Sequence, residues 1–191
     1  MRKLAWIAAI ISPVISSVTF AENNDHRVAF EIDPATFALN GYSLHVRVSP
    51  ESSPNVRFGV GIYSLEFPQI FVDINPDNKD GDWDVKLKTG IGLFGEYFLD
   101  KSRTGWFVGT QIAGQKYDIE DNETSERTHF KTALVMPYGG YKWDVNENLY
   151  LTFWGGIGLV DRIDGDNHLV TNKYDISPTV PYGAVHIGYQ L

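Results

Sequence analysis

The chain has 191 residues, 24 acidic against 16 basic side chains, a net charge of −8 and no cysteine. The lack of cysteine excludes disulfides, thiol catalysis and cysteine-ligated metal. The acidic balance makes the chain a poor nucleic-acid binder, because neutralisation of phosphates is the main source of that affinity. We therefore expect no nucleic-acid partner, and the length fits one domain.

The first residues resemble a targeting segment. Arg2 and Lys3 precede a mostly apolar stretch that ends in a small-x-small site at Ala21. This pattern predicts a secretory signal peptide over residues 1–21 and a mature domain over 22–191. A membrane-anchor helix is the alternative, but Pro13 interrupts a stretch that would need about 20 apolar residues to span a bilayer.

The rest of the chain repeats runs in which apolar residues alternate with polar or small ones, the period typical of strands. The connectors between the runs alternate in length, as in transmembrane barrels with tight turns at one end and long loops at the other. Residues 34–38 break this pattern, since they should form a long loop and are few. We predict eight strands, at 27–33, 39–48, 55–65, 85–99, 105–118, 129–144, 148–159 and 180–191.

Glycine recurs on one face of several runs. In a barrel of about eight strands the interior has room only for packed side chains, so inward glycines make space for bulky neighbours. Bends or bulges in an ordinary sheet are the alternative interpretation. The residues concerned are Gly59, Gly61, Gly90, Gly92, Gly155, Gly156 and Gly188.

Aromatic residues gather beside two of the short connectors. Tyrosine and tryptophan prefer the membrane interface, so these residues predict an aromatic girdle around one end of a barrel. Cross-strand packing in a soluble hairpin is the alternative. The residues are Tyr97, Phe98, Trp106, Phe107, Tyr141, Trp143 and Tyr150.

The last strand has one apolar face that runs to the final residue. Gly183, Val185, Ile187, Tyr189 and Leu191 lie on that face, and His186 and Gln190 lie on the other. This pattern resembles the terminal assembly signal of small bacterial outer-membrane β-barrel proteins of the eight-stranded type, which have an aromatic residue third from the end. Leu191 departs from the family, which usually ends in phenylalanine.

The resemblance implies an all-β, closed antiparallel transmembrane β-barrel of about eight strands in the outer membrane of a Gram-negative cell. It also implies contacts with outer-membrane lipids, the barrel-assembly machinery and periplasmic chaperones. The stretches FALNGYSLHVRVSP and WFVGTQIAG look like an uncharacterised subgroup of these barrels, so the resemblance assigns no activity. The oligomeric state is not predicted.

The inward register predicts a polar network in the lumen. A substrate or ion path is one interpretation, and a set of paired charges that fills the lumen is the favoured one, because an unpaired buried charge costs several kcal/mol. The candidates are Glu31, His45, Arg47, Arg57, Lys88, Glu96, Gln111, His186 and Gln190, with Lys142 as a further possibility.

Two classes of function fit these features. The first is a structural barrel or a porin-like one that passes small solutes or binds an apolar ligand. The second is a lipid-modifying hydrolase that resembles the lipid A deacylases, with Ser43 as nucleophile and His45 or His186 as base near Glu31. The histidine–serine–asparagine motif of those enzymes is absent, so no catalytic residue is assigned.

The long connectors contain clusters of acidic residues, which could suggest calcium. The segment Asp73 to Asp84 is rich in oxygen ligands, but its spacing does not match an EF-hand loop. The segment 161–167 is similar in character. We expect solvated acidic loops, no metal site and no cofactor.

Overall fold

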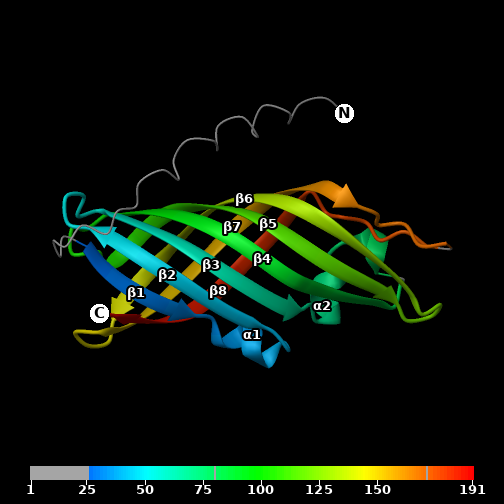
Figure 1. The fold of residues 1–191 in the computed structure, drawn as a ribbon, viewed down its shortest axis with the longest axis horizontal. Helices are drawn as coiled ribbons and strands as arrows, with labels where there is room; N and C mark the ends of the chain where they lie inside the picture. Colours follow the sequence, from blue (N-terminus) through cyan, green and yellow to red (C-terminus); the bar gives the residue numbers. More distant parts are fainter. Residues whose placement is uncertain (1–25, 80, 171) are drawn as a thin grey trace.

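The computed structural model describes residues 26–79, 81–170 and 172–191, which form a closed barrel of eight antiparallel strands (Figure 1). The predicted all-β barrel and its number of strands are confirmed. The predicted signal peptide, residues 1–21, lies outside the described residues. The strands are β1 His26–Ile32, β2 Tyr42–Pro50, β3 Val56–Glu66, β4 Trp83–Phe98, β5 Gly105–Asp121, β6 Glu126–Asp144, β7 Leu149–Gly165 and β8 Thr179–Gln190.

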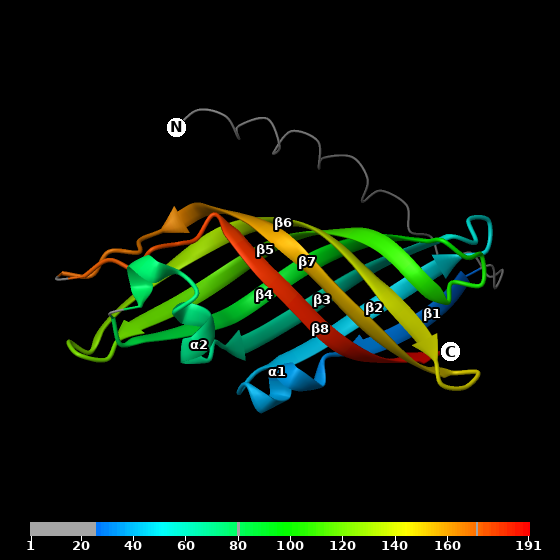
Figure 2. The same ribbon diagram turned by 180° about the vertical axis from the view of Figure 1, so that it is seen from behind.

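The barrel has two unlike ends. The turn end carries the connectors 51–55, 99–104 and 145–148 and the last residue of the chain. The loop end carries the connectors 33–41, 67–82, 122–125 and 166–178, and both α-helices belong to these connectors, with α1 nearer the middle of the barrel than α2 (Figures 1 and 2). Strands β4 to β7 extend further toward the loop end than their apolar pattern predicted.

Three short helical segments lie at the loop end. The connector 34–38, expected to be a plain loop, is the helix α1, Pro34–Ala38. The Asp33 carboxylate accepts a hydrogen bond from the Ala35 amide at 3.0 Å, and Pro34 occupies a first-turn position, where its missing N–H costs nothing. The next long connector contains α2, Gln69–Val72, and the 3₁₀ turn η1, Pro76–Asn78. No helix among the described residues has the length and apolar character needed to cross a membrane.

The outer surface of the barrel divides into two zones. Apolar side chains point outward around the wall nearer the turn end. Beyond them, toward the loop end, exposed ion pairs cover the strands, with Lys88 paired to Asp118 at 2.6 Å and Lys131 to Asp164 at 2.7 Å. We call the apolar zone the belt; its members include Phe30, Leu44, Phe58, Val60, Ile62, Ile91, Leu93, Val108, Ile112, Phe153, Ile157, Leu159, Val185 and Ile187.

A bulge in β4 corrects one predicted site residue. The register of β4 shifts between Leu87 and Thr89 against β5, and between Leu87 and Gly90 against β3. The residues of β4 that face inward therefore change from odd to even numbers. A strict alternation placed Lys88 inside the barrel and Leu87 outside. In the structure Leu87 is fully buried, whereas Lys88 points outward to Asp118 and does not belong to the lumen network.

Only some of the residues predicted to form the aromatic girdle lie on the outer surface. Tyr97, Trp106, Tyr141 and Trp143 are exposed near the turn end, as expected for a girdle. Phe98, Phe107 and Tyr150 are instead buried inside the lumen; the first two pack against each other with ring centroids 5.2 Å apart. Their positions in the strands alternate with those of the exposed rings.

The inward glycines make room for large side chains, as predicted. A Cβ atom on Gly61 would lie 2.5 Å from the His45 ring, and one on Gly188 would lie 2.1 Å from the Tyr150 ring. These distances are far below a carbon–carbon contact, so neither position admits a larger residue without moving its neighbour. Gly155 is different, because it faces outward on β7.

Candidate functional site

Four buried charges block the lumen in the half nearer the turn end. Glu31 on β1 accepts from Arg47 Nε at 2.8 Å and lies 2.9 Å from Arg57 Nη1. Glu96 on β4 accepts from Arg57 Nε at 2.5 Å and lies 3.6 Å from Arg47 Nη1. Each carboxylate therefore contacts both guanidinium groups. We call these four residues the charge cluster.

Three further side chains complete the partners of the two carboxylates. The Tyr150 hydroxyl donates to Glu31 at 2.9 Å, and the Tyr138 hydroxyl donates to Glu96 at 2.8 Å. The Nδ1 atom of His186 lies 3.2 Å from Glu31. With two positive and two negative groups, the charge cluster is formally neutral. Hydrogen-bonded partners of this kind offset the cost of burying charge.

Apolar rings seal the space around the charge cluster. The Arg47 guanidinium lies 4.3 Å from the centre of the Phe94 ring, and that of Arg57 lies 5.2 Å from the centre of Phe98. No member of the charge cluster is more than 4% exposed. The lumen is therefore filled at this level by side chains, which is the favoured interpretation of the sequence.

The structure brings together most, but not all, of the predicted network. Glu31, Arg47, Arg57 and Glu96 form the charge cluster, and the His186 ring contacts it directly. The His45 ring packs against the His186 ring at an angle of 47°, with ring centroids 4.8 Å apart. Lys88 does not belong to the network, because the β4 bulge turns it outward to Asp118. The remaining candidates lie around this group: Gln111 toward the loop end, Lys142 toward the turn end and Gln190 at the last position of β8.

The outlying candidates have their own partners. Gln111 donates to the Tyr63 hydroxyl at 2.9 Å, in a small polar group on the loop-end side of His45. Lys142 is buried, pairs with Asp144 and lies 4.4 Å from the centre of the Tyr150 ring. Gln190 is only partly buried, and its side chain makes no hydrogen bond to the charge cluster within the described part of the chain.

A large apolar cavity occupies the half of the lumen nearer the loop end. Its volume is about 320 Å³, within the range of small-molecule sites. Leu65, Leu134 and Tyr182 line its deep end. A smaller cavity of about 50 Å³ shares these three residues and continues to His45, Gln111 and Trp154. The two spaces form an apolar compartment with a polar floor.

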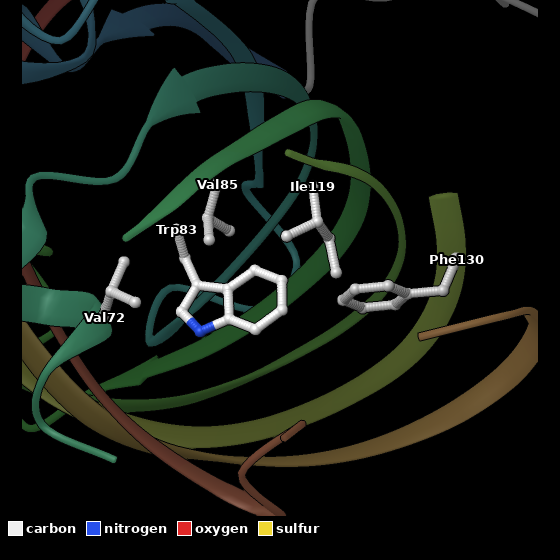
Figure 3. Close-up of a cluster of buried hydrophobic side chains, with 5 residues drawn as sticks. All are labelled: Val72, Trp83, Val85, Ile119 and Phe130. Carbon is white, nitrogen blue, oxygen red and sulfur yellow. The ribbon is translucent and has the colours of Figure 1, made fainter. Parts of the chain in front are cut away.

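The loops lie over the cavity at the loop end. An apolar cluster of Val72, Trp83, Val85, Ile119 and Phe130 lies beneath them, with Val72 supplied by α2 (Figure 3). Tyr174 from the connector 166–178 packs edge-on against Trp83, with ring centroids 5.5 Å apart. Burial raises the pKa of Tyr174 to about 12, so its hydroxyl stays neutral at physiological pH.

Hydrogen bonds tie the two long loops together over this cluster. The Asn75 side chain donates to the Asp175 carboxylate at 2.8 Å, and the Asn78 side chain donates to the Asp175 carbonyl at 2.9 Å. The Asp175 amide donates in return to the Asn78 side chain at 2.7 Å. We call this arrangement of α2, η1 and residues 166–170 and 172–178 the roof.

Sequence reasoning missed the roof and the cavity. The sequence pattern suggested the acidic residues of the first long loop as possible metal ligands. In the structure, the asparagines of that loop make the hydrogen bonds that hold it in place. In the described ranges, no group of three or more histidine or acidic residues is placed to hold a metal ion. The only local signal for the roof was the apolar content of Ile70, Phe71 and Val72 in an otherwise polar connector.

The geometry around Ser43 and the histidines bears on the hydrolase hypothesis. The Ser43 hydroxyl accepts from the Asp33 amide at 2.5 Å. The Nε2 atom of His186 accepts from the Trp154 indole at 3.1 Å, while its Nδ1 atom faces Glu31. No serine–histidine hydrogen bond occurs among the described residues. The hydrolase hypothesis stays a prediction without an assembled nucleophile and base.

Comparisons with known proteins give little beyond the fold. No family model and no curated protein matches the chain. One similar solved structure is Neisserial surface protein A (NspA), with 12% sequence identity and a TM-score of 0.43, covering 87% of this chain and 93% of that one. The barrel and its lumen therefore have to be interpreted from their own residues.

Proposed function

We propose that this protein is a Gram-negative outer-membrane barrel that binds a small apolar molecule in the loop-end half of its lumen. The apolar cavity between the charge cluster and the roof is the observation that carries the proposal. A cavity walled by leucine, phenylalanine and tyrosine favours an alkyl or aromatic ligand over an ion or a sugar. The role is passive, and no catalytic residue is part of it.

The outer surface supports the membrane location. A belt of outward apolar residues, edged by Tyr97, Trp106, Tyr141 and Trp143 at the turn end, is the surface that a bilayer requires of a barrel. The proposal includes the predicted signal peptide, cleaved near Ala21. It also includes recognition of the last strand, from Gly183 to Leu191, by the barrel-assembly machinery. In this orientation the turn end faces the periplasm.

The charge cluster favours binding over passage. A solute that crossed the barrel would have to separate Glu31 and Glu96 from Arg47 and Arg57, and breaking a buried ion pair costs about 3–5 kcal/mol. The cavity on the other side of the cluster needs no such rearrangement. The lumen is therefore better suited to hold a ligand than to conduct one.

We expect Leu134→Trp to reduce occupancy of the cavity at least ten-fold, because the indole would fill the space shared by the two chambers. The protein, refolded into phosphatidylcholine vesicles, is irradiated with a 16-carbon fatty acid that carries a diazirine, and the labelled peptides are identified by mass spectrometry. The wild type should be labelled at Leu65 and Tyr182, and excess palmitate should prevent this labelling.

The matched control is Val135→Trp, on the neighbouring outward position of β6. It should leave labelling of the cavity unchanged, and both variants should keep the labelling of Ile91 and Leu93 in the belt. Equal, non-saturable labelling of cavity and belt in the wild type would contradict a binding site inside the barrel.

A further inference from the structure

Side chains restrict access to the cavity along the barrel axis. The charge cluster closes it toward the turn end, and its four members are at most 4% exposed. Toward the loop end, the roof is held by the hydrogen bonds of Asn75 and Asn78 to Asp175 and by the packing of Tyr174 on Trp83. A ligand that arrived along the axis would meet the charge cluster at one end and the hydrogen-bonded roof at the other.

The side wall is incomplete at the junction where the barrel closes. β8 pairs with β7 over eleven residue pairs, from Leu149 with Tyr189 to Leu159 with Thr179. In contrast, β8 pairs with β1 over only four residue pairs, and the last of these joins Ile32 to Ile187. Within the described barrel, residues 179–186 of β8 therefore have a strand on one side only. We call this unpaired edge the seam.

The helix α1 covers part of the seam without being bonded to it. β1 ends at Ile32, and the chain then turns into α1 beside β8 (Figure 2). Backbone hydrogen bonds tie this segment to itself and to β3, where the Glu66 amide donates to the Leu39 carbonyl at 2.8 Å. In the described residues, no backbone hydrogen bond joins 33–41 to β8. The cover can therefore move without breaking the sheet.

The composition of the seam fits an opening. Pro181 has no N–H to offer a neighbouring strand, and proline in sheets is found at edges for this reason. Gly183 has no side chain, and the side chain of Ala184 is a single methyl group. Residues Val180 to Gly183 on one side and Asp33, Ala35 and Thr36 on the other all line the cavity. The cavity thus reaches the wall at this place.

The seam lies at the level of the belt. Pro181 is paired with Ile157 and Ala184 with Trp154 across the neighbouring strands, and the Ile157 side chain is 60% exposed in the belt. Phe37 on α1 is 52% exposed, so the cover also presents an apolar surface outward. An opening here would lead to lipid hydrocarbon and not to water.

We infer that the ligand is a membrane-dissolved amphiphile with a single alkyl chain, which reaches the cavity sideways from the bilayer through the seam between α1 and β8. This inference rests on the proposed function and adds the route and the class of ligand. An alkyl chain can slide between α1 and β8 and leave the charge cluster and the roof intact. A water-soluble ligand would gain nothing from a gap that faces lipid.

Disulfide locking tests the route, since the chain has no cysteine of its own. Ala35→Cys on α1 is combined in turn with Val180→Cys and Gly183→Cys on β8. Oxidation should link at least one pair, because α1 contacts β8 and all three residues line the same cavity. Failure of both pairs to link would show that α1 does not cover the seam and would overturn the inference.

The readout is the rate at which the cavity is labelled. Vesicles that hold the protein are mixed with vesicles that hold the diazirine fatty acid. A flash of light at successive times after mixing activates the diazirine, and the extent of labelling at Leu65 is measured at each time. The oxidised lock should slow this labelling at least ten-fold, and a reductant should restore the rate. The control pair, Phe153→Cys with Val185→Cys, joins strands that are already paired and should change nothing.

The outcomes separate the inference from the proposed function. If the reduced protein shows no saturable labelling of the cavity, the proposed function fails. If the reduced protein binds the fatty acid but the lock leaves the rate unchanged, the binding site stands and the lateral route is wrong. In that case the ligand passes through the roof.

Discussion

Replacing Glu31 by glutamine is expected to lower the free energy of unfolding of the barrel by about 3–5 kcal/mol. Glu31 is fully buried and contacts Arg47, Arg57, Tyr150 and His186. The amide keeps the shape but removes the charge, so two guanidinium groups share one remaining carboxylate. Urea unfolding of the refolded protein in detergent, followed by tryptophan fluorescence, measures the difference.

Glu120→Gln provides the control for this experiment. Glu120 pairs with Arg127 on the outer surface at 2.8 Å, and the Arg127 side chain is 75% exposed. Exposed pairs contribute about 0–1 kcal/mol, so this variant should unfold almost like the wild type. Similar small effects for both variants would mean that water reaches the charge cluster and that the lumen is not plugged.

Gly188→Val is expected to destabilise the folded barrel by about 3 kcal/mol or more, because it combines overpacking with the loss of a buried hydrogen bond. A Cβ atom at this position would lie 2.1 Å from the Tyr150 ring and 2.6 Å from its hydroxyl oxygen. The ring would have to move, and the Tyr150 hydroxyl would no longer reach Glu31. The same unfolding measurement applies, together with the yield of refolded protein.

Gly114→Val is the matched control, because a Cβ atom on Gly114 meets nothing within 4 Å. Valine suits a strand better than glycine, so this variant should be neutral or slightly stabilising. If Gly188→Val were equally neutral, Tyr150 would have another position available. Its role in holding Glu31 would then be wrong.

The architecture could be predicted from the sequence because it follows from local patterns. Alternation of apolar and small residues with period two places a strand and its two faces, and most connectors at the loop end are longer than those at the turn end. The connector 122–125 is the exception, because β5 and β6 extend into the predicted loop. The charge cluster followed from the same alternation, since Glu31, Arg47, Arg57 and Glu96 all lie on inward positions. Their pairing was expected from the cost of burying single charges.

The errors occurred where a local pattern was interrupted or where distant segments meet. Lys88 was misplaced because one extra residue at the β4 bulge exchanges the inner and outer faces. The roof was missed because Asn78 and Asp175 are 97 residues apart, and no periodicity connects them. The seam depends on where β1 ends relative to β8, which is a matter of register and not of composition.

Single-channel recording decides whether the charge cluster plugs the lumen beneath the proposed apolar ligand site. The refolded wild-type protein is inserted into a planar phospholipid bilayer in 1 M salt, where charges are screened over about 3 Å. The current across the bilayer is then recorded at a range of voltages. Because the charge cluster fills the lumen, we expect no stable conductance steps. Reproducible, ohmic steps from the wild type would contradict this expectation and would show a water-filled pore past Glu31 and Glu96.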